Sequence, residues 1–253
     1  MGGYNAFAYF YDKLTENISY KDRAAYFDRL IKLHGGKKGI LLDLACGTGS
    51  LSEEMARLGY DVIGTDASEE MLSCAMDKKF DSGLPIQYLC QDMTELDMFG
   101  TIDVTLCALD SLNHLKNIGD IRKTFDRVSL FCEPGGLFIF DMNMPYKHKN
   151  VLADNTYVYD LDDVYCVWQN SFDPHSPDCR VDISLDIFEK NEKGLYTRYA
   201  DELSEIAFDR AVIEKTIADS GMTLEAVYDY DSLEAPRPDS EKLVFASKKP
   251  ILY

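Results

Sequence analysis

Short apolar runs alternate with amphipathic segments along the first half of the chain. The apolar runs are continuous, as in strands buried on both faces, whereas the segments between them space their apolar residues at three and four positions, as in helices. An opening helix is predicted over 24–33, where the pattern stops at two glycines. The alternation predicts a parallel sheet with helices on both faces. The predicted strands are 39–45, 61–66, 86–92, 102–110 and 135–143, and the helices between them are 51–59, 68–80 and 118–132.

The pattern changes after Asn143. Residues 181–187 alternate strictly between aliphatic and polar side chains, which is the signature of a half-exposed antiparallel strand. Similar strand-like segments surround them, and a helix at 209–221 and two strands at 223–230 and 242–249 then resume the α/β pattern. The chain is therefore expected to hold a core at 37–144 and 209–253, an antiparallel β insertion at 145–208, and an N-terminal helical segment at 1–36.

The insertion is rich in aromatic residues. They suit the wall of a small acceptor site, and they equally suit a sheet that packs on the core or on a second subunit of a homodimer. They are Tyr157, Tyr159, Tyr165, Trp168, Phe172, Tyr196 and Tyr199.

Charge narrows the choice of partners. The chain has 44 Asp and Glu against 26 Lys and Arg, a formal net charge of −18, which disfavours a nucleic-acid partner. No window approaches the ~20 apolar residues of a membrane span, and the N-terminus lacks the pattern of a secretory signal. Seven cysteines without a C-x-x-C pair are interpreted as reduced core thiols of a cytoplasmic protein. The four histidines lack metal-ligand spacing, so no metal is expected.

The first predicted strand leads into a glycine loop, in the stretch GILLDLACGTGS (39–50). Gly47 and Gly49 resemble the start of the dinucleotide-binding pattern G-x-G-x-x-G, but Ser52 stands where its third glycine belongs. The strand ends in Asp43, whose carboxylate would repel a pyrophosphate. A ligand that carries an ammonium and a sulfonium group suits this position better.

Two further predicted strands also end in acids. Asp66 follows the glycine pair at roughly the 20-residue spacing of a ribose-binding acid, and its carboxylate can accept from both ribose hydroxyls. Asp92 could accept from an adenine amine, although such an acid alone is often a cap or turn residue. Three acids at consecutive strand ends lie along one edge of a parallel sheet, and together they favour a nucleoside ligand.

With these motifs the chain resembles the class I S-adenosylmethionine-dependent methyltransferases. The resemblance covers roughly 37–143 and resumes from residue 208 to the end. It implies a Rossmann-like, doubly wound, mostly parallel seven-stranded α/β sheet with an inserted antiparallel β lid, and S-adenosyl-L-methionine as the cofactor. The stretches that carry it are LLDLACGTGSLS (41–52), VIGTDASEEML (62–72), CQDMTEL (90–96), IDVTLCALDSLNHL (102–115) and EPGGLFIFDMN (133–143).

The resemblance implies a role for each motif. Ala45 departs from the glycine frequent in the family, and alanine is tolerated there if the backbone does not need a positive φ. The implied contacts are Asp43, Ala45, Gly47 and Gly49 with the methionine part, Asp66, Ala67 and Met71 with the ribose, Asp92 and Met93 with the adenine, and Leu109, Asp110 and Ser111 beside the methyl group.

The N-terminal stretch YNAFAYFYDKLTENISY (4–20) is similar to a small-molecule subgroup with the pattern Y-x-x-F-A-x-x-Y-D, which includes sugar-amine N,N-dimethyltransferases. This resemblance implies that Tyr4, Tyr11 and Tyr20 close over the cofactor. The alternative is that residues 7–14 form an apolar helical stripe that simply packs in the core.

The resemblance predicts methyl transfer to nitrogen or oxygen of a small molecule. His114 is the candidate general base, because imidazole side chains ordinarily titrate near neutral pH, and an ordinary first-turn helix residue is the alternative. Asp141 and Tyr146 are weaker candidates. A non-catalytic nucleoside-binding relative and an NAD-dependent oxidoreductase stay open as alternative functions.

Overall fold

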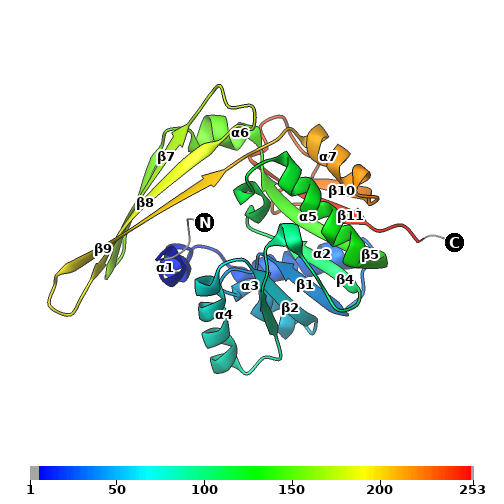
Figure 1. Cartoon of the computed structure of the whole chain (residues 1–253), viewed down its shortest axis with the longest axis horizontal. Helices are drawn as coiled ribbons and strands as arrows, with labels where there is room; N and C mark the ends of the chain where they lie inside the picture. Colours follow the sequence, from blue (N-terminus) through cyan, green and yellow to red (C-terminus); the bar gives the residue numbers. More distant parts are fainter. Residues whose placement is uncertain (1–5, 252–253) are drawn as a thin grey trace.

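The computed structural model describes residues 6–251 and is built on a seven-stranded sheet in the order β10-β11-β5-β4-β1-β2-β3 (Figure 1). The strands β1 to β5 are parallel, and β11 runs antiparallel to both β5 and β10. The predicted seven-stranded, mostly parallel sheet is thus confirmed. The strands are β1 (Ile40–Leu44), β2 (Asp61–Asp66), β3 (Gln87–Cys90), β4 (Ile102–Cys107), β5 (Cys132–Asn143), β10 (Thr223–Asp229) and β11 (Lys242–Lys248).

Helices cover both faces of this sheet because its inner strands are apolar on both sides. On β1, Leu41 packs in the cluster formed with α2 (Tyr20–Leu33) and α3 (Ser50–Arg57), whereas Leu42 packs in the cluster formed with α5 (Ile118–Phe131) and α7 (Arg210–Asp219). The helix α4 (Glu69–Ser82) packs beside β2 and β3. The strand order reverses next to β1, since β2 and β4 flank it, and such a switch point opens a crevice at the carboxyl ends of the strands.

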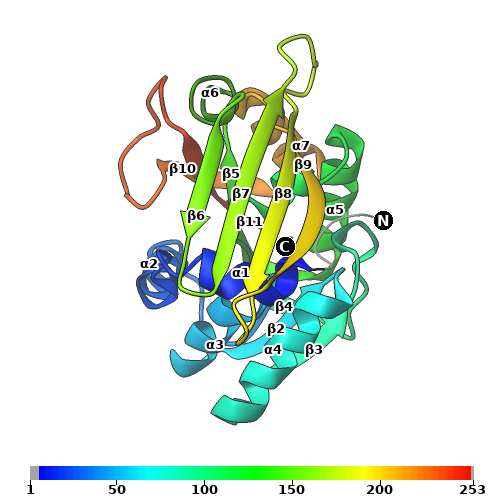
Figure 2. The same cartoon turned by 90° about the vertical axis from the view of Figure 1, so that its left-hand side faces the viewer.

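The insertion forms a second, four-stranded antiparallel sheet in the order β6-β7-β8-β9. Figure 2 shows its strands side by side, with α1 (Phe7–Leu14) at the lower end of the sheet. The inner face carries Trp168 and Tyr199, which contact α1, while Tyr165 and Tyr196 lie on the outer, exposed face. Trp168 and Tyr199 therefore pack within the molecule, whereas the position of Tyr165 and Tyr196 leaves packing on a second subunit as the open alternative for these two. The strands are β6 (Thr156–Asp160), β7 (Val164–Phe172), β8 (Val181–Lys190) and β9 (Tyr196–Glu205), preceded by α6 (Pro145–Lys147) and a π-helical turn, η3 (His148–Leu152).

One buried side chain joins both ends of the insertion to the core. Asn113, in the short helix η2 (Ser111–His114), is fully buried. Its Nδ2 donates to the carbonyl oxygens of Asn143 (3.0 Å) and Ile206 (2.7 Å), and its Oδ1 accepts from the backbone N–H of Asn143 (2.9 Å). Asn143 ends β5 and Ile206 follows β9, so one satisfied amide fixes where the insertion leaves and re-enters the core.

The cysteines are less uniformly buried than the sequence suggested. All seven are free thiols, and Cys46, Cys107, Cys132 and Cys166 are buried as expected. Cys90 is exposed because it ends the edge strand β3, and Cys74 and Cys179 are partly exposed. In the described part of the chain, no helix has both the length and the apolar character needed to cross a bilayer.

The glycine loop depends on backbone conformations that only glycine adopts freely. Gly49 has a φ of 76°, and a Cβ there would lie 2.3 Å from the hydroxyl oxygen of Tyr88. Gly83, at the end of α4, has a similar φ of 68° but faces open space. An alanine at Gly83 would therefore suffer only from the strained φ, whereas an alanine at Gly49 would suffer from the strained φ and from a clash with Tyr88.

We expect Gly49→Ala to cost about 2–5 kcal/mol of unfolding free energy, since strain of ~1–2 kcal/mol adds to a packing conflict of ~1–3 kcal/mol. The matched change Gly83→Ala should cost only about 1–2 kcal/mol. Urea unfolding followed by circular dichroism measures both. Equal losses would show that Tyr88 yields and that the conflict is absent.

Candidate active site

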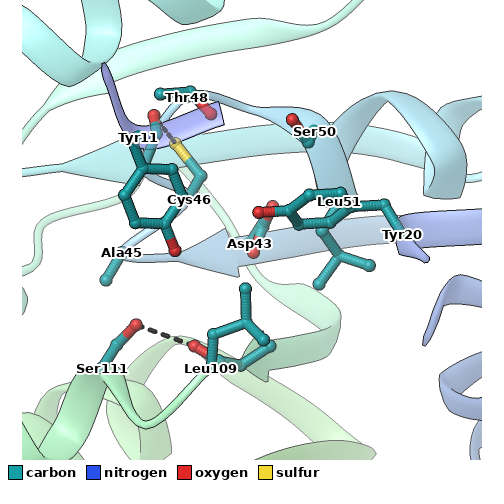
Figure 3. A pocket seen from close by; sticks show the side chains of 12 residues that line it. Tyr11, Tyr20, Asp43, Ala45, Cys46, Thr48, Ser50, Leu51, Leu109 and Ser111 are labelled. Carbon is teal, nitrogen blue, oxygen red and sulfur yellow. Dashed lines mark hydrogen bonds between the residues drawn. The ribbon is translucent and has the colours of Figure 1, made fainter. Parts of the chain in front are cut away.

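A small cavity lies at the carboxyl ends of β1 and β4, at the predicted switch point. It encloses about 40 Å³, far less than the roughly 300–1,000 Å³ of a typical small-molecule pocket. Figure 3 shows Asp43 between the tyrosine rings and the loop that carries Leu109 and Ser111. The lining residues come from the N-terminal segment, the glycine loop and the β4 end: Tyr11, Tyr20, Asp43, Ala45, Cys46, Gly47, Thr48, Ser50, Leu51, Ala108, Leu109 and Ser111.

Asp43 is the buried acid of the cavity. It lies near the end of β1 with only 2% of its surface exposed, and Ser52 Oγ donates a hydrogen bond to its Oδ2 at 2.5 Å. Burial raises the pKa of Asp43 to about 7, although the Ser52 hydrogen bond acts in the opposite direction. No lysine or arginine among residues 6–251 forms an ion pair with it. The site thus holds a carboxyl group whose negative charge lacks a counter-charge.

The glycine loop approaches the cavity through Gly47 rather than Gly49. A Cβ at Gly47 would meet only the Met71 sulfur, at 3.9 Å, whereas Gly49 is packed against Tyr88 and is absent from the lining. Ala45 has a φ of 58°, so the condition for tolerating alanine is not met and this residue sits in a strained conformation. The next residue is tied to β2, because the Cys46 N–H donates to the carbonyl oxygen of Thr65 at 2.9 Å.

Asp66 organises this loop from the end of β2. Its Oδ2 accepts from the N–H of Gly47 and its Oδ1 from the N–H of Ser68, both at 2.9 Å. Burial raises the pKa of the carboxyl group, and these backbone hydrogen bonds oppose the rise. Ala67 is exposed beside it, whereas Met71 is buried against α1.

Asp92 and Met93 lie apart from the cavity lining. Asp92 is exposed and caps the short helix η1 (Met93–Glu95), where its Oδ1 accepts from the N–H and the hydroxyl of Thr94, each at 2.8 Å. Met93 packs against the core beneath α5. The structure therefore gives both residues a structural role, and their contact with an adenine stays a prediction.

The loop after β4 places its predicted residues in different directions. Leu109 and Ser111 line the cavity, but the Asp110 carboxylate turns away to accept from Lys242 Nζ (2.9 Å) and Asn143 Nδ2 (2.6 Å). The Lys242 ion pair, against the opposing effect of burial, lowers the pKa of Asp110. Asp110 thus lies outside the lining, and its charge is paired with Lys242.

The candidate bases also lie outside the cavity lining. His114 Nδ1 is 3.3 Å from the carbonyl oxygen of Ser204, so this ring contacts the end of β9. Asp141 is fully buried with both oxygens accepting backbone N–H groups, and Tyr146 is on the exposed α6 turn. Proton transfer by His114 stays a prediction.

Two of the three predicted tyrosines lie at the cavity. Tyr11 and Tyr20 both line the cavity, whereas Tyr4 lies outside the described residues. Burial raises the pKa of the Tyr20 hydroxyl, although hydrogen bonds with Thr15 and Tyr11 act against the rise. Tyr20 begins α2, with Ser19 as its N-cap, and Tyr11 projects from α1.

Sequence reasoning missed the contact that holds α1 on the glycine loop. Asp12 accepts from Thr48 Oγ1 at 2.7 Å and pairs with Lys78 of α4. Lys78 Nζ in turn donates to Thr48 Oγ1 (3.0 Å) and Ser50 Oγ (2.6 Å). The signal was present, since Asp12 is the acid of the Y-x-x-F-A-x-x-Y-D pattern, but its lysine partner lies 66 positions away and no local pattern connects them.

Comparison with known proteins identifies the family. A family model described as a methyltransferase domain matches residues 41–136. A Geobacillus sp. (strain WCH70) protein with a provisional methyltransferase name is 32% identical over 97% of this chain and 99% of its own length. The crystal structure of a S-adenosylmethionine-dependent methyltransferase from Clostridium acetobutylicum ATCC 824 superposes with a TM-score of 0.88 at 32% identity, covering 98% of this chain and 99% of the other.

A more distant structure shares the fold. It is an amino pentose methyltransferase from Micromonospora echinaspora with S-adenosylmethionine bound, with a TM-score of 0.74, 18% identity, and 95% and 96% of the two chains covered. The buried carboxyl group, the glycine loop and the strand-end acids described above are consistent with such a ligand. The chain belongs to the class I S-adenosylmethionine-dependent methyltransferases, and S-adenosylmethionine is its cofactor.

Proposed function

We propose that this methyltransferase transfers the methyl group to nitrogen or oxygen of a small-molecule acceptor by in-line displacement. The observation that carries the proposal is the position of α1, which lines one side of the cavity through Tyr11 and itself packs on the inner face of the insertion. A site covered on this side by the protein's own helix and insertion suits a small acceptor better than a duplex or a folded protein. The amino pentose acceptor named for the Micromonospora relative belongs to the same chemical class.

The residues of the cavity fit a cationic cofactor. Asp43 supplies an unpaired carboxylate for the methionine ammonium, and Gly47 leaves room for close approach. Asp66 lies outside the cavity lining with both oxygens accepting backbone N–H groups, so as the candidate ribose ligand it would use its remaining lone pairs. Tyr11 and Tyr20 would exclude water from the reacting end. The cofactor supplies an electrophilic methyl group when bound. Within this proposal, His114 would accept a proton only from an acceptor that must lose one early.

An oxidoreductase that uses NAD fits less well. A dinucleotide places its pyrophosphate at the N-terminus of the helix that follows the glycine loop. Here the carboxylate of Asp12 already lies there, hydrogen-bonded to Thr48 and Ser50 at the start of α3. Because Asp12 already accepts from these hydroxyl groups, and Lys78 pairs with Asp12, a pyrophosphate would have to displace this carboxylate from its partners.

Location and assembly complete the proposal. Free thiols that are partly exposed, such as Cys74 and Cys179, or exposed, such as Cys90, suit the reducing cytoplasm. If the chain forms a homodimer, the outer face of the insertion, with Tyr165 and Tyr196 exposed, offers apolar surface for it.

We expect S-adenosylhomocysteine to bind the purified protein and Asp66→Ala to weaken that binding by at least ~1.5 kcal/mol, as for a hydrogen bond to a charged group. Titration calorimetry measures the affinity, with NADH titrated in parallel. Because Asp66 also accepts the Gly47 and Ser68 N–H groups, a urea unfolding curve of the variant serves as the control for loop damage. Unchanged affinity would remove Asp66 from the site, and no binding at millimolar ligand would overturn the proposed site.

The raised pKa of Asp43, about 7, predicts that the affinity for S-adenosylhomocysteine depends on pH. The ionised form is the one that pairs with a cationic ligand, so affinity should rise with pH from 6 to 8, by up to about tenfold per unit below the pKa. Asp43→Asn should bind more weakly at pH 8 and lose this dependence. The exposed acid Asp77 provides a matched control, Asp77→Asn, which should keep it. A pH profile in Asp43→Asn equal to that of the native protein would contradict the assignment.

The same shift has a consequence for stability without ligand. The folded-state pKa of Asp43 lies above the unfolded value, so its contribution to stability falls as pH rises from about 4 to about 7. Asp43→Asn cannot ionise, and it should therefore raise the melting temperature at pH 8 relative to the native protein. Differential scanning calorimetry at pH 5 and pH 8 tests this, and a lower melting temperature at pH 8 would contradict it.

Acceptor class is tested with labelled S-adenosylmethionine against pools of small amines and hydroxyl compounds, alongside RNA and protein extracts. We expect label in the small-molecule fractions and none above background in the polymers. Methylation confined to a polymer would overturn the acceptor proposal. Tight cofactor binding with no transfer to any pool would instead favour a non-catalytic binding protein.

A further inference from the structure

The turn that follows β4 is strained at two consecutive residues. Leu109 has a φ of 57° and Asp110 a φ of 56°, although neither is glycine. Residues other than glycine rarely adopt this left-handed backbone conformation, and they keep it only where the surrounding structure enforces it. Leu109 forms part of the cavity wall, so the strain lies at the site itself.

A single buried carboxylate receives both strained N–H groups. Asp141, near the end of β5, accepts from the N–H of Leu109 at 3.0 Å through Oδ2 and from the N–H of Asp110 at 2.7 Å through Oδ1. Consecutive backbone N–H groups that converge in this way form an anion-binding concavity. Its occupant here is a side chain of the neighbouring strand, fully shielded from solvent.

Lys242 offsets part of the cost of burying this carboxyl group, although burial still raises the pKa of Asp141. Its Nζ lies 3.7 Å from Asp141 Oδ1 and 2.9 Å from Asp110 Oδ1, with 9% of the side chain exposed. The Tyr230 ring lies 4.6 Å from the same nitrogen. A carboxylate with two backbone donors and a buried ammonium group nearby is fixed in position, so it can in turn fix the turn that it binds.

We propose that Asp141 is a positioning residue that holds the strained Leu109–Asp110 turn in place as a wall of the cofactor site, with Lys242 as its buried counter-charge. Asp141 is thereby reassigned from candidate base to scaffold, since both its oxygens are engaged with the backbone. The inference deepens the proposed function and rests on the cofactor site described for it.

A double-mutant cycle with glycine tests the idea. Asp141→Asn replaces one acceptor oxygen by an N–H₂ group, and the turn should lose its conformation and weaken S-adenosylhomocysteine binding by about tenfold. Leu109→Gly adopts the left-handed conformation without support, so in that background Asp141→Asn should cost less than about threefold. The control Asp28→Asn changes a buried acid of α2 that is not part of the cavity lining, and it should leave the affinity unchanged.

Equal losses in both backgrounds, or an unchanged affinity in Asp141→Asn, would overturn the positioning role. Failure of the native protein to bind S-adenosylhomocysteine would instead overturn the proposed site, so the two failures are distinguishable.

A second measurement needs neither a variant nor a ligand. In the native protein, amide hydrogen exchange by NMR should show Leu109 and Asp110 protected by at least about 100-fold although they lie in a loop, because Asp141 binds both N–H groups. Exchange at the rate of an open loop would overturn the inference even if the variants fail to fold.

Discussion

The side-chain amide of Asn113 is the interaction on which the relation between the two sheets depends. β5 passes from the core into the insertion at Asn143, and the chain returns after β9 at Ile206. Backbone groups at both points would be left without partners where the sheets part, and Asn113 satisfies three of them in a site shielded from solvent. Asn113 also belongs to the loop that follows β4. The insertion is therefore anchored to the same segment that lines the cavity.

The N-terminal helix depends on that anchoring. An isolated helix of eight residues is unstable in water, so α1 owes its stability to what it packs on. On one side Asp201 of β9 accepts the N–H of Phe7 at 2.7 Å, and Trp168 packs edge-on against the Phe7 ring. On the other side Asp12 binds Thr48 and Lys78. The helix that carries Tyr11 into the cavity thus requires the insertion and the core at a fixed separation.

Local pattern was sufficient for the sheet and for the strand-end acids. Continuous apolar strands such as β1 are buried on both faces, and their carboxyl ends must meet at one edge, which brought Asp43 and Asp66 together as predicted. The direction of a side chain beyond a strand end was not predictable in this way. Asp110 turned from the cavity because Lys242, 132 positions later, pairs with it.

The other differences have local and long-range causes. Asp92 caps η1, a role that its sequence already allowed, and Ala45 adopts a strained φ that only the assembled loop enforces. Because side chains alternate along any strand, β7 places Tyr165 and Trp168 on opposite faces, but the sequence does not say which face meets α1. Pairing between distant elements is the information that one sequence lacks.

The buried acids near the site differ in whether the protein supplies a positive charge beside them. Burying a carboxylate is costly unless its charge is compensated, and Asp141 and Asp110 share Lys242 for that purpose. Asp43 is buried as deeply, yet its hydrogen-bond donor is the neutral hydroxyl of Ser52. The fold thus places one lysine beside two of these acids and leaves the third without a cationic partner, to ionise only near neutral pH. A carboxyl group kept dry and without a cationic partner lowers stability, and a ligand that brings the missing positive charge recovers that loss. S-adenosylmethionine carries such a charge at both its ammonium and its sulfonium group, so the energetic defect at Asp43 is itself an argument for where the methionine end of the cofactor binds.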